Sequence, residues 1–237
     1  HAGGMMVLHR KSGYIEYYNR HNSNLPSNNI YSIISDGYGG LWVASLEYLL
    51  HFDIDKRNFT IVDVDEDGHK LQQYNRLLFC DSKKRIWAGG EMGISVFNQV
   101  GTSLLPNTDF QIASVLKQAF VNCFYETSSG YLWIGTRNGL FALKESDKQF
   151  LQYTTENGLP SNVIYGILED AYGRLWISTN QGLSCLNPES GKFRNFTIMD
   201  GLQGNQFNAG AYCRKDNGYM LFGGVNGITS FRPETLI

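Results

Sequence analysis

The sequence predicts an all-β chain of short antiparallel sheets, and three observations lead to that prediction. Glycine is abundant at 26 of 237 residues, and Tyr, Phe and Trp together make up 14% of the chain. This composition favours strands joined by tight turns. Tryptophan recurs at spacings of 45, 46 and 43 residues, at Trp42, Trp87, Trp133 and Trp176. No segment places apolar residues at helical spacing over ten or more positions, so helices are not expected.

Each repeat unit contains four candidate strands in a fixed order. The first is an apolar run ended by a turn, as in IYSIISD (30–36) and VIYGILED (163–170). The second carries the tryptophan in LWVAS, IWAGG, LWIGT and LWIST, and GLFALK and GLSCLN are examples of the third. The fourth is seen in NFTIVD, QFLQYT and KFRNFT. A unit of about 40 to 50 residues with four strands is typical of a β-propeller blade.

The turn between the first two strands has its own signature. Six residues before each tryptophan stand Asp36, Asp81, Thr127 and Asp170. An aspartate at this place accepts hydrogen bonds from turn amides, and the glycines nearby allow positive φ. We expect each tryptophan ring to fill the space between neighbouring blades. We interpret Phe222 as the anchor of a fifth unit, with Asp216 as its turn residue.

The units define the predicted organisation of a single propeller fragment of about five blades. Residues 1–24 are expected to end a preceding blade, and residues 201–237 to form a last, incomplete one. Four full blades lie between them, at 25–70, 71–115, 116–158 and 159–200. A propeller closes to remove its exposed strand edges. We therefore expect the chain to be a piece of a larger ring.

Composition and spacing also exclude several classes of protein. The net charge is −2 and no basic patch stands out, so nucleic acid is not an expected partner. The cysteines Cys80, Cys123, Cys185 and Cys213 lack metal-ligand spacing and are expected to be buried free thiols. The segment VDVDEDGHK (62–70) is interpreted as a solvated acidic loop, because a calcium loop that begins at Asp63 needs a carboxylate where Tyr74 stands. No metal or other cofactor is expected.

The repeat resembles the two-component regulator propeller repeat. The similarity rests on DGYGGLWVAS (36–45), SSGYLWIGTRNGLFAL (128–143) and the connecting segments NSNLPSNNIYSI (22–33) and ENGLPSNVIYGI (156–167). The resemblance implies a seven-bladed ring, of which this chain would be a piece. It further implies the periplasmic sensor of a Bacteroidetes hybrid two-component system, anchored in the inner membrane, which responds to glycan-derived oligosaccharides. Other propellers and an immunoglobulin-like module of the same parent chain would be its neighbours, and a second copy in a homodimer is a further expected partner.

Sugar recognition requires aromatic faces and planar polar side chains. In propellers such groups usually lie on the loops that enter the innermost strand. Arg76 is the strongest single candidate, because it replaces an apolar or small residue at its place in the repeat. Asparagine also suits turns, so a structural role stays open for several candidates. The predicted ligand-binding residues are Asn28, Tyr31, Asn75, Arg76, Asn122, Asn162, Tyr165 and Asn208.

Two other function classes stay open. A propeller can be a scaffold that binds other proteins, and a propeller can be a glycan-active enzyme. No pair of carboxylates, serine nucleophile motif or metal-ligand spacing in the sequence indicates catalysis. We therefore expect this segment not to be an enzyme, although the resemblance implies a histidine kinase in the parent protein.

Overall fold

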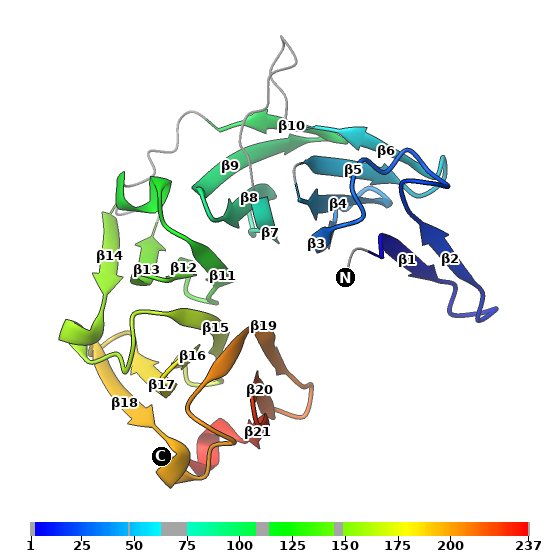
Figure 1. Ribbon diagram of the computed structural model, residues 1–237. Helices are drawn as coiled ribbons and strands as arrows, with labels where there is room; N and C mark the ends of the chain where they lie inside the picture. Colours follow the sequence, from blue (N-terminus) through cyan, green and yellow to red (C-terminus); the bar gives the residue numbers. More distant parts are fainter. Residues whose placement is uncertain (1–2, 47, 63–74, 108–113, 145–148, 237) are drawn as a thin grey trace. The chain divides into compact units, whose positions relative to one another are not determined.

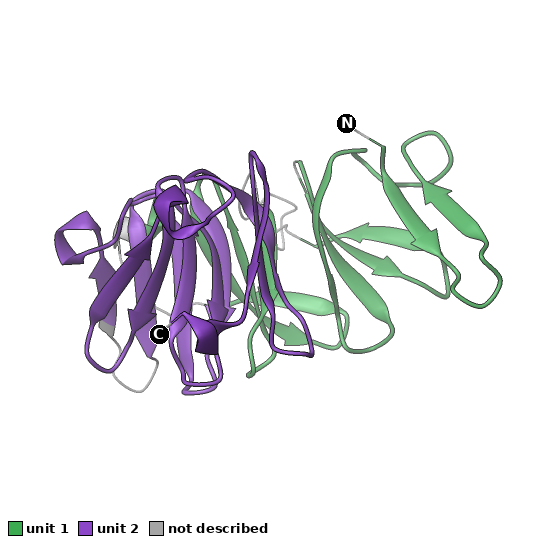
Figure 2. Ribbon diagram, turned by 90° about the horizontal axis from the view of Figure 1, so that it is seen from below, with its two compact units in different colours: residues 1–118 green, residues 119–237 purple. Residues whose placement is uncertain are grey.

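The computed structural model describes residues 3–46, 48–62, 75–107, 114–144 and 149–236. These residues form six antiparallel sheets and contain no α-helix, which confirms the all-β prediction (Figure 1). In every sheet the strands are ordered as they follow one another in the chain. The chain divides into two compact units, residues 1–118 and 119–237 (Figure 2).

The first unit contains a two-stranded sheet and two four-stranded sheets. Strands β3 and β7, the first of the two larger sheets, lie next to each other. This is the arrangement of propeller blades, in which first strands are innermost. The elements of this unit are β1 (Met5–Leu8), β2 (Ile15–Tyr18), β3 (Ile30–Ser35), β4 (Gly40–Ser45), β5 (Leu49–Asp53), β6 (Asn58–Ile61), β7 (Asn75–Cys80), β8 (Arg85–Gly90), β9 (Gly93–Val100), β10 (Ser103–Pro106) and the 3-10 turn η1 (Ser114–Lys117).

The second unit contains two four-stranded sheets and one three-stranded sheet. Their first strands, β11, β15 and β19, lie side by side, and their last strands lie on the outside (Figure 1). The elements are β11 (Val121–Glu126), β12 (Tyr131–Thr136), β13 (Gly139–Lys144), β14 (Gln149–Tyr153), η3 (Thr155–Asn157), β15 (Ile164–Glu169), β16 (Leu175–Thr179), β17 (Gly182–Asn187), β18 (Lys192–Phe196), η4 (Ile198–Asp200), β19 (Phe207–Arg214), β20 (Met220–Gly224), β21 (Gly227–Phe231) and η5 (Pro233–Thr235).

The four tryptophans occupy one position in their sheets. Each lies on the second strand, is at most 2% exposed, and pairs with the residue eight places earlier on the first strand. Trp133 shares an apolar cluster with Ile164 and Ile177 of the following sheet, and the ring centres of Trp176 and Phe231 lie 4.7 Å apart. The rings of Trp42, Trp133 and Trp176 therefore fill the space between neighbouring sheets of their own units, as expected. Losing one of them costs about 3–5 kcal/mol in a well-packed core.

The predicted anchor of the last unit is wrong by one residue. Leu221 pairs with Cys213, eight residues earlier, just as each tryptophan pairs in its own sheet. Phe222 instead pairs with Tyr212 and points to the opposite face. The turn residue is Lys215, whose N–H bonds to the Tyr219 carbonyl at 2.8 Å. Asp216 is therefore one place too late. In this sheet the large aromatic residue, Phe222, faces the preceding sheet. Aligning the repeats on it therefore places the anchor one residue too late.

The first turn of each complete sheet is held as the sequence predicted. One carboxylate oxygen of Asp170 accepts from the N–H groups of Tyr172 and Arg174, at 2.9 and 3.0 Å. Asp36 and Asp81 make the equivalent pairs of bonds. Three residues before the tryptophan the backbone has positive φ, which glycine adopts without strain. Lys84 holds that place in the β7–β10 sheet with a φ of 63°.

Candidate functional site

Each four-stranded sheet has one extra residue near the start of its first strand. Strand pairing passes over this residue, so that the register shifts by one. A β-bulge of this kind leaves the extra residue unpaired and redirects its side chain, and bulges are frequent beside functional sites. The residues passed over are Tyr31, Arg76, Asn122 and Tyr165. All four belong to the set predicted from the sequence.

The three-stranded sheet departs from this pattern. Its pairing is irregular over the longer interval between Phe207 and Tyr212. Asn208, another predicted residue, lies in this interval and is exposed. The corresponding end of β19 therefore presents a longer irregular segment in place of a single bulged side chain.

Two of the bulged residues meet in the first unit. The guanidinium carbon of Arg76 lies 5.0 Å from the centre of the Tyr31 ring, within the range of a cation–π contact. Its Nη2 lies 2.7 Å from Oε1 of Glu91, which follows β8. Tyr31 is 43% exposed. This Tyr31–Arg76–Glu91 cluster offers an aromatic face, cationic donors and a carboxylate acceptor at one place.

The sequence did not point to Glu91. It lies in the turn between the second and third strands, and only the pairing of β7 with β8 brings it beside Arg76. Asn75, beside Arg76, pairs with Gly90 in the β7–β8 ladder. The role of Asn75 as a ligand contact stays a prediction.

In the second unit, Asn122 links two sheets. Its Nδ2 donates to the Ile164 carbonyl at 2.8 Å, which joins β11 to β15. Tyr165 is half-buried and packs against the apolar cluster that contains Trp176 and Phe207. Both side chains therefore have structural contacts of their own, and the structure leaves their ligand role a prediction.

Asn28 and Asn162 hold the connecting loops. The Oδ1 of Asn28 accepts from the N–H of Arg20 at 2.9 Å, and that of Asn162 from the N–H of Thr155 at 2.8 Å. The Oδ1 of Asn205 accepts from the N–H of Ile198 at 2.8 Å in the same way, although Asn205 is not among the predicted residues. The signal was present, since all three stand two residues before the apolar start of a first strand. These amide oxygens therefore help to hold the connecting loops in place.

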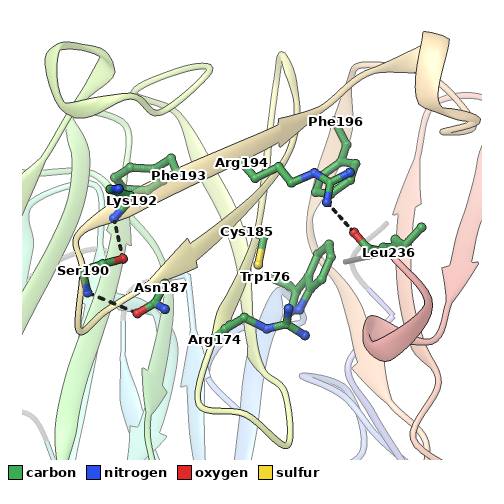
Figure 3. A pocket seen from close by; sticks show the side chains of 10 residues that line it. All are labelled: Arg174, Trp176, Cys185, Asn187, Ser190, Lys192, Phe193, Arg194, Phe196 and Leu236. Atoms are coloured by element: carbon green, nitrogen blue, oxygen red, sulfur yellow. Dashed lines mark hydrogen bonds between the residues drawn. The ribbon is translucent and has the colours of Figure 1, made fainter.

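The sheets of each unit also leave clefts between their outer parts. One cleft of about 280 Å³ lies at the β15–β18 sheet and the C-terminal turn, and three basic residues, Arg174, Lys192 and Arg194, line it (Figure 3). Arg194 Nη1 donates to the Leu236 carbonyl at 2.8 Å, beside the rings of Trp176 and Phe196 (Figure 3). In the first unit, a cleft of about 440 Å³ lies between the β3–β6 and β7–β10 sheets.

A third cleft, of about 350 Å³, separates the β11–β14 and β15–β18 sheets. We call it the Trp133 cleft. It lies toward the ends of β11 and β15 that carry the first turns, away from the bulges. The side chains that line it are mainly aromatic and acidic, whereas three basic residues line the cleft of Figure 3. Its lining includes Ser128, Ser129, Tyr131, Trp133, Leu151, Tyr153, Glu169, Tyr172, Asn187 and Glu189.

The cysteines are free, as predicted, but not all are buried. Burial raises the pKa of the Cys123 thiol to about 12 and that of Cys185 to about 11. Cys213 is exposed, because β19 turns its neighbour Tyr212 toward the core and Cys213 toward the other face. Cys80 is partly exposed.

Two further features concern metals and membranes. Across the described ranges, no group of three or more His, Cys, Asp or Glu residues is placed to hold a metal ion. Residues 63–70 of the acidic segment lie outside the described residues. None of the helical turns that the structure describes is long and apolar enough to cross a membrane.

Comparison with known proteins identifies the repeat. Residues 24–47, 116–138 and 158–181 match the two-component regulator propeller family. The chain is 29% identical over 195 residues to Histidine kinase P4 of Formosa agariphila, an alignment that covers 79% of this chain and 14% of that protein.

Solved structures show the same architecture. The extracellular domain of the hybrid two-component system BT3049 from B. thetaiotaomicron matches with a TM-score of 0.73 and 22% identity, over 93% of this chain and 31% of that one. The extracellular domain of BT4673 from the same organism gives a TM-score of 0.76 and 19% identity, over 97% and 30%. The chain thus spans about a third or less of each relative. Three segments of the chain therefore match the two-component regulator propeller repeat, and the solved structures show that the chain shares their fold.

Proposed function

We propose that this chain is the ligand-sensing part of the periplasmic sensor of a hybrid two-component histidine kinase and response regulator. The observation that carries the proposal is the match of three segments to the two-component regulator propeller family. The 29% identity to Histidine kinase P4 supports it. Kinase activity would belong to other parts of the parent protein, and this segment would bind but not catalyse.

The proposed ligand is an oligosaccharide derived from glycans. The Tyr31–Arg76–Glu91 cluster supports this class, because it combines a ring face with donors and an acceptor. Sugars bind through C–H surfaces on aromatic rings and through hydroxyls on planar polar groups. Asn122, Tyr165 and Asn208 would supply equivalent contacts in the second unit. Three of the bulged residues, Tyr31, Asn122 and Tyr165, lie within the matched family segments.

Signalling would follow from a change in how the sensor modules pack. The neighbours would be further propeller and immunoglobulin-like modules of the parent, and a homodimer would bring two copies together. A ligand shifts such an equilibrium only as far as it binds one arrangement more tightly than the other. The proposal therefore requires measurable binding to the sensor region.

Calorimetric titration of the chain with a panel of oligosaccharides tests this proposal. We expect heat with at least one of them, and a loss of affinity of about tenfold or more in Arg76→Ala. Lys56→Ala is the matched control, because Lys56 also pairs with a carboxylate at 2.7 Å but lies on an exposed turn away from the bulges. Equal losses in both variants contradict a site at Arg76. No heat with any oligosaccharide favours the protein-interaction scaffold.

A further inference from the structure

The cleft at the β15–β18 sheet and the C-terminal turn, which we call the basic cleft, gathers positive charge (Figure 3). Lys192 and Arg194 on β18 are exposed, and neither has an ion-pair partner among the described residues. Arg174 differs from them, because its Nε lies 2.7 Å from Asp170 Oδ2. The acidic residue Glu189 lines the Trp133 cleft and not this one. The basic cleft therefore carries two cations that no described carboxylate balances.

The strand register brings the polar side chains of the basic cleft to one face of the sheet. Asn187 pairs with Lys192, and Cys185 pairs with Arg194. Residues that pair across strands, and residues two apart on one strand, project from the same face. Lys192 and Arg194 therefore point the same way, with about 7 Å between them along β18. Asn187 lies beside Lys192 on the neighbouring strand.

These side chains offer a ligand hydrogen-bond donors, because the chain itself already uses their acceptors. Asn187 Oδ1 accepts from the N–H groups of Glu189 and Ser190, at 2.9 and 3.2 Å. Ser190 Oγ accepts from the N–H of Lys192 at 3.4 Å (Figure 3). All of the polar groups that remain for a ligand are donors on exposed residues: the Asn187 NH2 group, the Ser190 hydroxyl, the Lys192 ammonium and the Arg194 guanidinium.

We propose that the basic cleft binds a small oxyanion of the phosphate or sulfate type. An oxyanion has only acceptors and carries the charge that Lys192 and Arg194 lack. The ammonium and the guanidinium would form charge-assisted bonds to its oxygens, and Asn187 and Ser190 would donate to the others. Arg194 would use the nitrogens other than Nη1, which donates to the Leu236 carbonyl at 2.8 Å. The volume of about 280 Å³ lies just below the usual range of ligand pockets and fits a small ligand.

The β3–β6 sheet has a cleft at the equivalent place, with a volume of about 440 Å³, and it provides an internal comparison. By strand register, Asp53 stands there in the place of Asn187. Thr60 likewise stands in the place of Arg194. Lys56 Nζ lies 2.7 Å from Asp53 Oδ2, so this cleft balances its own charge. Only the cleft of the β15–β18 sheet is therefore expected to take an oxyanion.

Spectra of the arginine Nε–H groups, recorded by ¹⁵N–¹H correlation on the whole chain, test the inference. Inorganic phosphate and sulfate probe the free ion, phenyl phosphate probes the same group on a larger molecule, and trimethyl phosphate is the uncharged comparison. We expect the Arg194 signal to move with at least one of the three anions and not with trimethyl phosphate. Arg137, an exposed arginine outside the cleft, reports non-specific binding. An Arg194 signal that no anion moves, or that moves no more than the Arg137 signal, overturns the proposal.

Variants separate this site from the rest of the surface. Lys192→Gln and Arg194→Gln each remove one charge from an exposed side chain and should weaken phosphate binding about tenfold. Lys56→Gln makes the same change in the equivalent cleft of the β3–β6 sheet and should leave binding unchanged. Arg76→Ala should also leave it unchanged, so this site and the proposed sensor site can fail separately. Binding that survives both changes on β18, or an equal loss in Lys56→Gln, overturns the inference.

Discussion

The β11–β14 and β15–β18 sheets place a tryptophan at the same position but hold it differently. In the second of these sheets, Asp170 Oδ2 accepts from Trp176 Nε1 at 3.0 Å and from Arg174 Nε at 2.7 Å. In the first, Thr127 holds the turn only, and Trp133 Nε1 is unpaired among the described residues. Both tryptophans are nonetheless buried, at 2% and 1% exposure.

The difference teaches that packing between sheets positions the ring and that the hydrogen bond is optional. A buried ring contributes several kcal/mol by packing, whereas one hydrogen bond contributes about 1 kcal/mol net. The turn residue can therefore vary without loss of the fold.

The largest effect is expected for Asp170→Ala. This change removes two turn bonds and leaves the Arg174 guanidinium and the Trp176 N–H without their acceptor. We expect the free energy of unfolding to fall by about 3–5 kcal/mol, as when one partner of a buried ion pair is deleted. Thr127→Ala, the matched change, should cost about 1 kcal/mol. Urea unfolding measures both changes. Equal losses of stability in the two variants would contradict the proposed difference between the two turns.

The next largest expected effect is an increase in the free energy of unfolding. Thr127→Asp combined with Tyr131→Arg copies the Asp170–Arg174 pair into the β11–β14 sheet. We expect unfolding to require about 1 kcal/mol more, because the Trp133 N–H acquires an acceptor. Thermal and urea unfolding of the double variant provide the measurement. A loss of stability would mean that the unpaired N–H costs the fold nothing.

A third test uses pH in the β3–β6 sheet, where His51 Nε2 lies 2.8 Å from Asp36 Oδ2. Burial acts to raise the Asp36 pKa, but the His51 bond and the N–H groups of Tyr38 and Gly40 outweigh it, so that the pKa is lowered. A lowered folded pKa stabilises the protein above the ordinary pKa of 3.8, and that stability is lost as pH falls through the folded value.

Asp36→Asn should therefore be less stable than the parent above pH 3.8, and the difference should shrink in more acidic solution. Urea unfolding of both proteins between about pH 5 and pH 2.5 measures this difference. A difference that stays constant over that range would show that Asp36 acts without its charge.

The smallest effect concerns the turn backbone. Lys84 has a φ of 63° at the place where Gly130 and Gly173 have φ of 80° and 75°. Lys84→Gly should raise the free energy of unfolding by about 0.5–1 kcal/mol, since glycine carries no steric cost there. The neighbouring Lys83→Gly should lower it, because added chain freedom is its main effect. Chemical unfolding of both variants measures these changes. A lower free energy of unfolding for Lys84→Gly would contradict a steric cost at this position.

Much of the candidate site was visible in the sequence. Tyr31, Arg76, Asn122 and Tyr165 follow the connecting loops at one place in the repeat, and the structure makes each of them the extra residue of a bulge. The bulge itself could not be predicted. It depends on how the first strand pairs with the second, and local sequence does not fix that pairing to one residue. The contact of Arg76 with Glu91 was missed for the same reason.

The sequence by itself determined the all-β class, the repeat, the buried tryptophans and the aspartate turns. These follow from residue preferences and from spacing along one strand or turn. Only the tertiary structure decided that Leu221 and not Phe222 occupies the anchor position and that Cys213 is exposed. Each of these depends on which face of a strand meets which neighbouring sheet. A shift of one residue reverses that face, so it is settled only when the sheets pack.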